Sequence, residues 1–334
     1  MLDFDILCLV ITIWLGDPCQ IGSDTTQVKS ALRKFIIATP STFSMHPQLP
    51  RELVSTIISQ VTDNSTLLSL CLAAKATYRE GSAQLYHSID ETGLQYGALR
   101  RQIKLLETLA SNPYLSSLVH SYSIWSIAPR VAPEHIPDFQ ARAGRPTEWE
   151  HPEERFWHLL PLALNLMVNL KQLRFRERTG QPSADWLFAN VTFQLKRLEW
   201  GSQREGAGMA NFLVRQHHLE HLCILDGLLC PLAPSACVSV RSLKGDLTTL
   251  KRFLPGRPAI THLEWVLGHT ENPAGLVRSP TLLPELGRIT HLIIGGNSMR
   301  QNLAQYLVGC FHSLVALHLL SLKKVSEQIE PLDT

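Results

Sequence analysis

The fold of this chain follows from a six-residue stretch, Leu170-Lys171-Gln172-Leu173-Arg174-Phe175, and from its recurrence downstream. The stretch has the form apolar-x-x-Leu-x-apolar. The spacing of two between its last two apolar residues places both on the same side of a β-strand. Further copies follow, with Val240…Leu243 as a weaker one: Leu195…Leu198…Trp200, Leu219…Leu222…Ile224, Ile260…Leu263…Trp265, Ile289…Leu292…Ile294 and Leu314…Leu317…Leu319.

The spacing of these copies predicts a repeat protein. They begin 20 to 29 residues apart, which is the period of leucine-rich repeats. Helical segments such as Thr248–Leu254 and Leu303–Phe311 fill the gaps, so each unit is predicted to be one helix and one parallel strand. This α/β half resembles an irregular leucine-rich-repeat solenoid, without the regular Asn that follows the strand in the commonest types. The alternative is a leucine-rich α/β domain with coincidental spacing.

The alternation also predicts which side chains point to the concave face of the solenoid. One column is Gln172, Arg197, His221, Ser242, His262, His291 and Ala316; the next is Arg174, Glu199, Cys223, Lys244, Glu264, Ile293 and His318. With Arg176 they form a candidate target-binding surface, which is basic near Arg174 and Arg197 and rich in imidazole further along. Arginine forks there suit carboxylate or phosphate groups of a partner. The alternative is that these side chains are only solvated.

A second apolar stretch lies upstream, between Leu49 and Ile89. Pro50 suits the first position of a helix. The apolar residues that follow have helical spacing: Leu53, Val54, Ile57, Ile58 and Val61. Asp63-Asn64-Ser65 offers oxygens to cap a second helix, and a third is predicted from about Thr77 to Tyr86, with Gly81 unfavourable inside it. So small a unit has little interior, so part of its apolar surface is expected to face another surface.

These three helices resemble an F-box. The resemblance rests on the opening Leu49-Pro50-x-Glu52-Leu53-x-x-x-Ile57-Ile58 and on the closing Tyr78-Arg79…Leu85-Tyr86. Ala73-Ala74 replace the larger or hydroxylated residues usual in the family, and Gly81 is expected to loosen the third helix. The resemblance implies docking to the Skp-type adaptor of cullin-RING ubiquitin ligases. The residues that it implies for this interface are Leu49, Pro50, Leu53, Ile57, Ile58, Leu67 and Leu70.

The chain divides into residues 1–44, an N-terminal extension, 45–90, the helical module, and 91–334, a linker helix and the solenoid. In the extension Ile6–Leu15 is apolar, but it is preceded by Asp3 and Asp5 rather than by the positive charge of a signal peptide. It is also too short to span a bilayer. The alternative is a secreted or anchored protein.

Between the module and the repeats, helices are expected from Leu94 to Leu109 and from Phe156 to Leu170. A strand-like run is expected from Leu115 through Tyr122 and Ile124. A Pro-rich irregular insertion is expected at about 128–152.

Composition excludes several classes of protein. The net charge is only +2, too small to predict nucleic-acid or membrane binding. The seven cysteines form no C-x-x-C pair, which favours reduced thiols in a cytoplasmic or nuclear protein.

Few residues point to enzyme chemistry. His217-His218-Leu219-Glu220-His221 fits the H-x-x-E-H pattern of inverted zinc peptidases, but that chemistry needs both histidines on one helical face. Because Leu219 and Leu222 are in register with the repeat, His221 is expected in a strand. Nucleophile–base arrangements, Walker motifs and G-x-G-x-x-G are absent. The sequence therefore predicts no catalysis, metal or cofactor.

Two functions remain. The first is a non-catalytic substrate receptor, whose F-box-like helices bind the adaptor of a cullin-RING ligase while the repeats bind an unknown target protein. The second is an interaction scaffold, in which the same helices only cap the N-terminal end of the solenoid.

Overall fold

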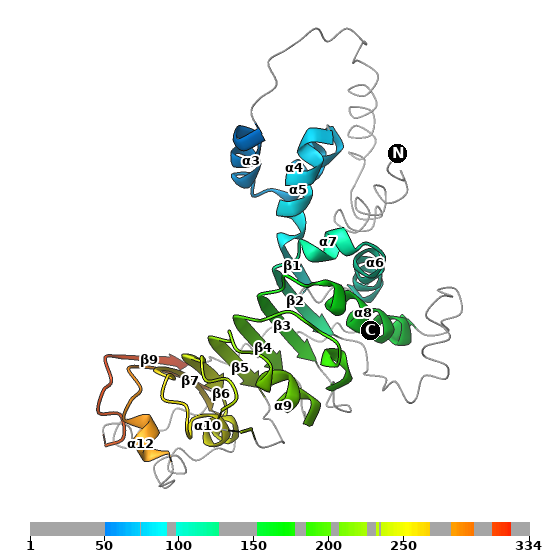
Figure 1. Cartoon of the computed structure of the whole chain (residues 1–334). Helices are drawn as coiled ribbons and strands as arrows, with labels where there is room; N and C mark the ends of the chain where they lie inside the picture. The colour runs from blue at the N-terminus through cyan, green and yellow to red at the C-terminus, as the bar shows by residue number, and fades with distance from the viewer. Residues whose placement is uncertain are drawn as a thin grey trace, which may run out of the picture.

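The computed structural model describes residues 51–73, 75–91, 98–126, 152–177, 185–201, 207–225, 232–233, 235–267, 282–296 and 309–321. In this part of the chain nine strands form one sheet, all parallel and in sequence order (Figure 1). They are β1 (Ser88–Glu91), β2 (Ser121–Ser126), β3 (Gln172–Glu177), β4 (Arg197–Gly201), β5 (His221–Leu225), β6 (Ser242–Gly245), β7 (His262–Leu267), β8 (His291–Gly296) and β9 (Ala316–Ser321). Since neighbours in sequence are neighbours in the sheet, the chain advances one strand per unit, as a solenoid does.

The strand register follows from the repeat. Leu173 lies beside Leu198, and Phe175 beside Trp200; each of the four is at most 2% exposed. The same rows continue through the later strands. The predicted α/β repeat with a parallel sheet is therefore confirmed for residues 172–321 where they are described.

Two strands extend the sheet upstream of the predicted repeats. Ser88 pairs with Ser121, which in turn pairs with Gln172 of β3. Ile89 and Tyr122 occupy the row of the motif leucines and are each 1% exposed. Because β1 begins at Ser88, the last residues of the predicted helical module belong to the sheet.

The predicted strand-like run from Leu115 begins too early. Residues Pro113–Ser117 form the short helix α7, and β2 begins only at Ser121. Asn112 caps the helix, since its Oδ1 accepts the N–H of Leu115 at 3.2 Å, and Pro113 occupies its first turn.

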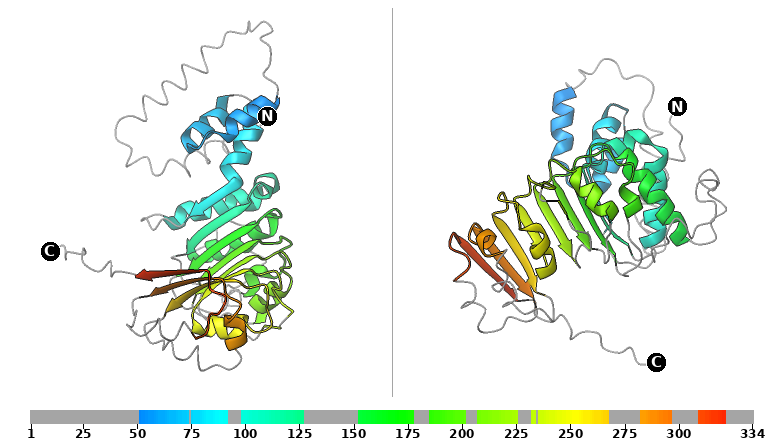
Figure 2. Two further views of the ribbon diagram at one scale, coloured as in Figure 1. Left: turned by 90° about the vertical axis from the view of Figure 1, so that its left-hand side faces the viewer. Right: turned by 60° about the horizontal axis from the view of Figure 1, so that its bottom comes forward.

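Helices cover one face of the sheet and leave the other open in the described part of the chain (Figures 1 and 2). Over the first strands lie α6 (Ala98–Ser111) and α8 (Pro152–Leu166), which pack on each other. Along the later strands the return segments are shorter: η4 (Asp185–Phe188), α9 (Ala207–Val214), α10 (Leu247–Phe253) and α12 (Leu283–Leu286). The helices predicted near 94–109, 156–170 and 248–254 are thus present, with shifted ends.

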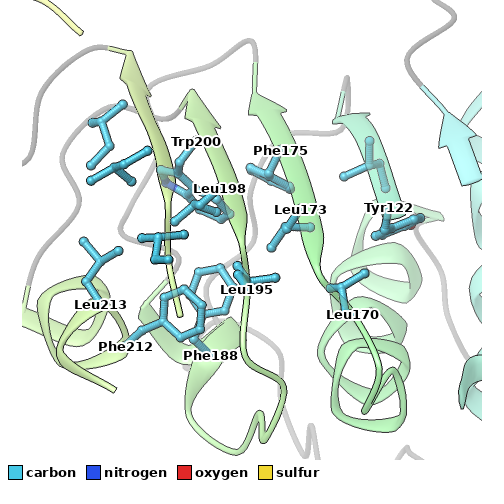
Figure 3. Packing of buried hydrophobic residues seen from close by; sticks show 14 of the residues in the cluster. Tyr122, Leu170, Leu173, Phe175, Phe188, Leu195, Leu198, Trp200, Phe212 and Leu213 are labelled. Carbon is cyan, nitrogen blue, oxygen red and sulfur yellow. The ribbon is translucent and has the colours of Figure 1, made fainter. Parts of the chain in front are cut away.

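Aromatic rings fill the core between the sheet and these segments (Figure 3). Trp200 stacks on Phe175, with ring centroids 4.3 Å apart, and meets Phe188 edge-on at 5.1 Å. Phe188 in turn stacks on Phe212 at 4.1 Å. The last apolar position of the motif therefore buries its largest side chains where the return segments also supply rings.

A buried arginine connects two successive units. Arg257 is 2% exposed, and its guanidinium donates to Ala233 and Ala236 carbonyls at 2.8 and 2.9 Å and to that of Phe253 at 2.9 Å. Phe253 is the last residue of α10, where helix carbonyls lack partners and the helix dipole favours a cation. Burial lowers the pKa of Arg257, but the guanidinium stays charged because its normal pKa is so high.

The N-terminal module consists of α3 (Arg51–Ser59), α4 (Asn64–Ala73) and α5 (Lys75–His87). The predicted cap of α4 is present: the Asp63 carboxylate accepts the N–H of Thr66 at 2.7 Å and the hydroxyl of Ser65 at 2.6 Å. Hydrogen bonds, led by that from Ser65, lower the pKa of Asp63 to about 2. The module joins the sheet directly, because α5 runs into β1.

Gly81 has a different role from the one expected. It is buried in α5 against α4, and a Cβ there would lie 2.5 Å from the Sγ of Cys71. The residue therefore lets the two helices approach closely, and α5 continues through it from Lys75 to His87.

We expect Gly81→Ala to lower the free energy of unfolding by about 1 kcal/mol. Overpacking costs about 1–3 kcal/mol, while the better helix propensity of alanine returns only about 1 kcal/mol. Denaturant titration of the single variants and of Gly81→Ala with Cys71→Ala measures the coupling. The double variant should recover much of the loss; a Gly81→Ala protein more stable than the wild type would contradict the close packing.

Several predicted features lie outside the described residues: the extension 1–44, Leu49 and Pro50, most of the Pro-rich insertion, and residues 303–308 of a predicted helix. Among the helices that are described, none has both the length and the apolar character to cross a bilayer.

Candidate interaction surfaces

The face of the sheet opposite the helices carries both predicted columns of side chains, and with Arg176 these columns define the open face. Gln172 pairs with Arg197 and Arg174 with Glu199. The register then runs through His221, Ser242, His262, His291 and Ala316 in one column and Cys223, Lys244, Glu264, Ile293 and His318 in the other. The structure thus brings the whole predicted surface together.

Two arginines on β3 enclose a glutamate on β4. Arg174 donates from Nε to Oε2 of Glu199 at 2.7 Å, and Arg176 donates from Nε to Oε1 at 2.9 Å. Arg176 lies across Gly201, whose missing side chain leaves the space. Glu199 is only 5% exposed. It is therefore unavailable to a partner, and its role is to hold the two guanidinium groups in place.

The charge of this cluster is fixed near neutral pH. Burial raises the pKa of Glu199, but the hydrogen bonds and charges of Arg176 and Arg174 outweigh burial, and the net pKa is below its usual value. The three side chains together carry a charge of +1.

Beside the cluster the open face has a hollow of about 180 Å³. Its lining is almost entirely polar: Ser121, Ser123, Gln172, Leu173, Arg174, Arg197 and Glu199. The two serines come from β2, a strand that the sequence prediction did not include in the candidate surface, and this strand supplies one wall. The alternation Ser121-Tyr122-Ser123, in which Tyr122 replaces the motif leucine, could have placed both serines on the open face.

The open face changes character toward the C-terminus. Lys244 and Glu264, neighbours on β6 and β7, form an ion pair. Cys223 is 8% exposed, and burial, with the charge of Glu199, raises its pKa to about 12. This thiol is neutral at physiological pH and unsuited to nucleophilic chemistry.

Imidazoles stack in pairs on neighbouring strands. The rings of His262 and His291 are 4.2 Å apart and nearly parallel, at 7°, and those of His87 and His120 are 4.6 Å apart. Burial lowers the pKa of His262, and His291 and His221 lower it further. His262 is therefore neutral near pH 7.

The predicted adaptor-binding residues separate into two groups. Leu53 and Ile57 lie one turn apart on α3 and are 50% and 55% exposed, whereas Ile58 and Leu67 are 3% and 2% exposed. Ile58 and Leu67 therefore belong to the core of the module rather than to its surface. Leu70 is partly buried against that core, and Leu49 and Pro50 are not described. The five apolar residues between positions 53 and 61 gave α3 so broad an apolar stripe that its outward side could not be predicted.

A further apolar surface, which the sequence prediction did not single out, lies at β9. Leu317 and Leu319 occupy the rows that are buried in the other strands, yet they are 43% and 52% exposed, and Val315 is 79% exposed. No described unit follows β9 to cover them.

The zinc-like pattern does not form the geometry that it requires. His217 and His218 lie in a turn and His221 begins β5, so no helical face presents two of the histidines together. The described residues contain no group of three or more His, Cys, Asp or Glu side chains placed to hold a metal ion.

Comparison with known proteins gave likenesses among solved structures only. No family model matches the chain, and no curated protein matches its sequence. Among solved structures, the leucine-rich repeat-containing protein LegL7 from Legionella pneumophila is similar, with 14% sequence identity and a TM-score of 0.35. The match covers 83% of this chain and 89% of that one.

Proposed function

We propose that this chain is a non-catalytic substrate receptor of a cullin-RING ubiquitin ligase. In this proposal the helical module binds a Skp-type adaptor, and the open face of the sheet binds the protein to be modified. The proposal includes a cytoplasmic or nuclear location and needs no metal or cofactor.

The observation that carries the proposal is the outward stripe on α3. Ile58 anchors α3 to the module core, while Leu53 and Ile57 face away from it and are about half exposed. Two large apolar side chains one helical turn apart suit a groove on a partner. They also belong to the part of the sequence that resembles an F-box.

A receptor of this kind acts by position. The adaptor binds the helical module, and the open face of the sheet binds the target. A lysine of the target is therefore kept at high effective concentration near the transfer machinery. The direct passage from α5 into β1 gives the two surfaces a short connection.

We expect Leu53→Ala with Ile57→Ala to weaken adaptor binding by about 30- to 150-fold. The two side chains would lose about 2–3 kcal/mol of apolar burial between them. Since neither is buried in the free chain, the melting temperature should not change. Binding of the full chain to a purified Skp-type adaptor, measured by calorimetry, tests this expectation.

A matched control is Val214→Ala with Val238→Ala, because these residues are 44% and 55% exposed but lie among the return segments. This control should bind the adaptor as the wild type does. Equal adaptor affinity of wild type and α3 variant, or no affinity in either, would contradict the proposal.

A scaffold without a ligase is the second candidate function. One observation favours it: Ile58, Leu67 and Leu85 of the module belong to the same continuous core as the repeats, as a cap would. Under this reading the purified chain binds no adaptor, and a chain without residues 51–87 loses the circular dichroism of its repeats.

A further inference from the structure

The hollow beside the arginine cluster has the features of a binding site. Two guanidinium groups line it from neighbouring strands, Arg174 from β3 and Arg197 from β4, and two hydroxyls, of Ser121 and Ser123, line it from β2. All four side chains offer hydrogen-bond donors. Oxyanions are bound by such a mixture of charged and neutral donors.

One of the two arginines, Arg174, is held in position before any ligand arrives. Arg174 uses Nε for Glu199, which leaves the Nη groups of its fork for another acceptor. Glu199 is itself 5% exposed and is held from its other side by Arg176. Because Arg174 is already ordered in the free chain, a ligand would not have to supply that part of the ordering.

The charge of the site fits a dianion better than a carboxylate. Arg174, Arg176 and Glu199 sum to +1, and Arg197, which makes no recorded ion pair with a described residue, adds another positive charge. A phosphate monoester carries about −1.5 to −2 at pH 7, whereas a carboxylate carries −1. Asp90 on β1 is exposed but is not among the lining residues.

The size of the hollow limits the ligand. Its volume of about 180 Å³ is well below the roughly 300–1,000 Å³ of pockets for drug-sized molecules. It suits the end of one side chain rather than a nucleotide or other cofactor, and it opens on the surface where an extended segment of a partner can lie.

We propose that this hollow binds a phosphorylated serine or threonine side chain of a partner protein, through Arg174, Arg197 and the hydroxyls of Ser121 and Ser123. This inference rests on the proposed role of the open face in target binding, but it does not depend on the adaptor.

The test uses the full chain and two peptide libraries with randomised flanks, one with central phosphoserine and one with serine. At 0.15 M salt we expect the immobilised protein to enrich the phosphorylated library about tenfold or more over the other. Arg197→Gln should remove most of this enrichment, and Ser123→Ala should reduce it. Lys251→Gln, an equal loss of charge at an exposed position of α10, should leave it unchanged.

Equal capture of both libraries, or equal loss in Arg197→Gln and Lys251→Gln, would overturn the inference. Binding of free inorganic phosphate without enrichment of the phosphopeptides would also overturn it, because the ligand would then be the ion and not a phosphorylated side chain. The Arg197 side chain forms no hydrogen bond or ion pair with a residue in the described part of the chain, so an unchanged melting temperature is expected and shows that loss of binding is local. Adaptor binding is measured in a separate experiment. Its absence would contradict the ligase proposal and would not bear on phosphopeptide binding.

Discussion

Arg257→Ala is expected to lower the free energy of unfolding by at least about 3 kcal/mol. The substitution removes a 2%-exposed side chain and leaves the Ala233, Ala236 and Phe253 carbonyls without their donor. Each buried polar group left unsatisfied costs about 1–3 kcal/mol. The cavity adds to this loss, and so does the lost cation–π contact, because the Cζ of the guanidinium lies over the Phe253 ring, 5.4 Å from its centroid.

Two further variants separate the causes. Arg257→Met keeps much of the volume but no donor, so it should be almost as unstable as the alanine variant if hydrogen bonds dominate. Arg241→Ala, an exposed arginine before β6, should change stability by no more than about 0.5 kcal/mol. Denaturant unfolding followed by circular dichroism measures all three. Similar stabilities for Arg257→Ala and Arg241→Ala would show that the buried network is not required.

The parallel sheet could be predicted from sequence because its signal is repeated. Every copy of the motif places a leucine in one row, and all but the weaker copy, which has Gly245, place a second large apolar residue in the next, so a mismatch in one unit is outweighed by its neighbours. β1 was missed, and the strand-like run that became β2 was not assigned to the sheet, because Ile89 and Tyr122 replace the leucine and a long insertion separates β2 from β3. Their alternation is nevertheless that of the other strands.

The sequence predicted on which side of an element the candidate residues lie, but not how exposed each side chain is. Period-two alternation correctly placed Glu199 on the open face, yet alternation cannot show that the two arginines would cover it. Helical spacing likewise gave α3 a broad apolar stripe, and only the packing of α4 and α5 decides that Ile58 is inside and Ile57 outside.

Some features had no readable sequence signal. Arg257 stands in Pro255-Gly256-Arg257-Pro258, which is typical of a solvated turn. Its burial depends on carbonyls of the preceding unit, which are separated from it by more than twenty residues. Gly81 was misread for a related reason: helix propensity describes one helix, whereas the space at Gly81 is set by Cys71 on another.

Trp200→Ala is expected to destabilise the chain by about 3–5 kcal/mol. Trp200 is 1% exposed, and its ring contacts Phe175 on the preceding strand and Phe188 in the return segment. Loss of the ring opens a cavity between two neighbouring units. Contacts between neighbouring units supply much of the stability of a solenoid, so the loss is expected to be large.

Leu319→Ala is the matched control, because Leu319 occupies the same row of the repeat in β9 but is 52% exposed. It should lower the free energy of unfolding by no more than about 1 kcal/mol, since little apolar surface is returned to water. Denaturant titration of both variants compares one motif position in two surroundings. Equal losses in the free energy of unfolding would show that the position in the motif determines the contribution of the side chain. A several-fold larger loss for Trp200→Ala would show that burial by the adjoining unit determines it.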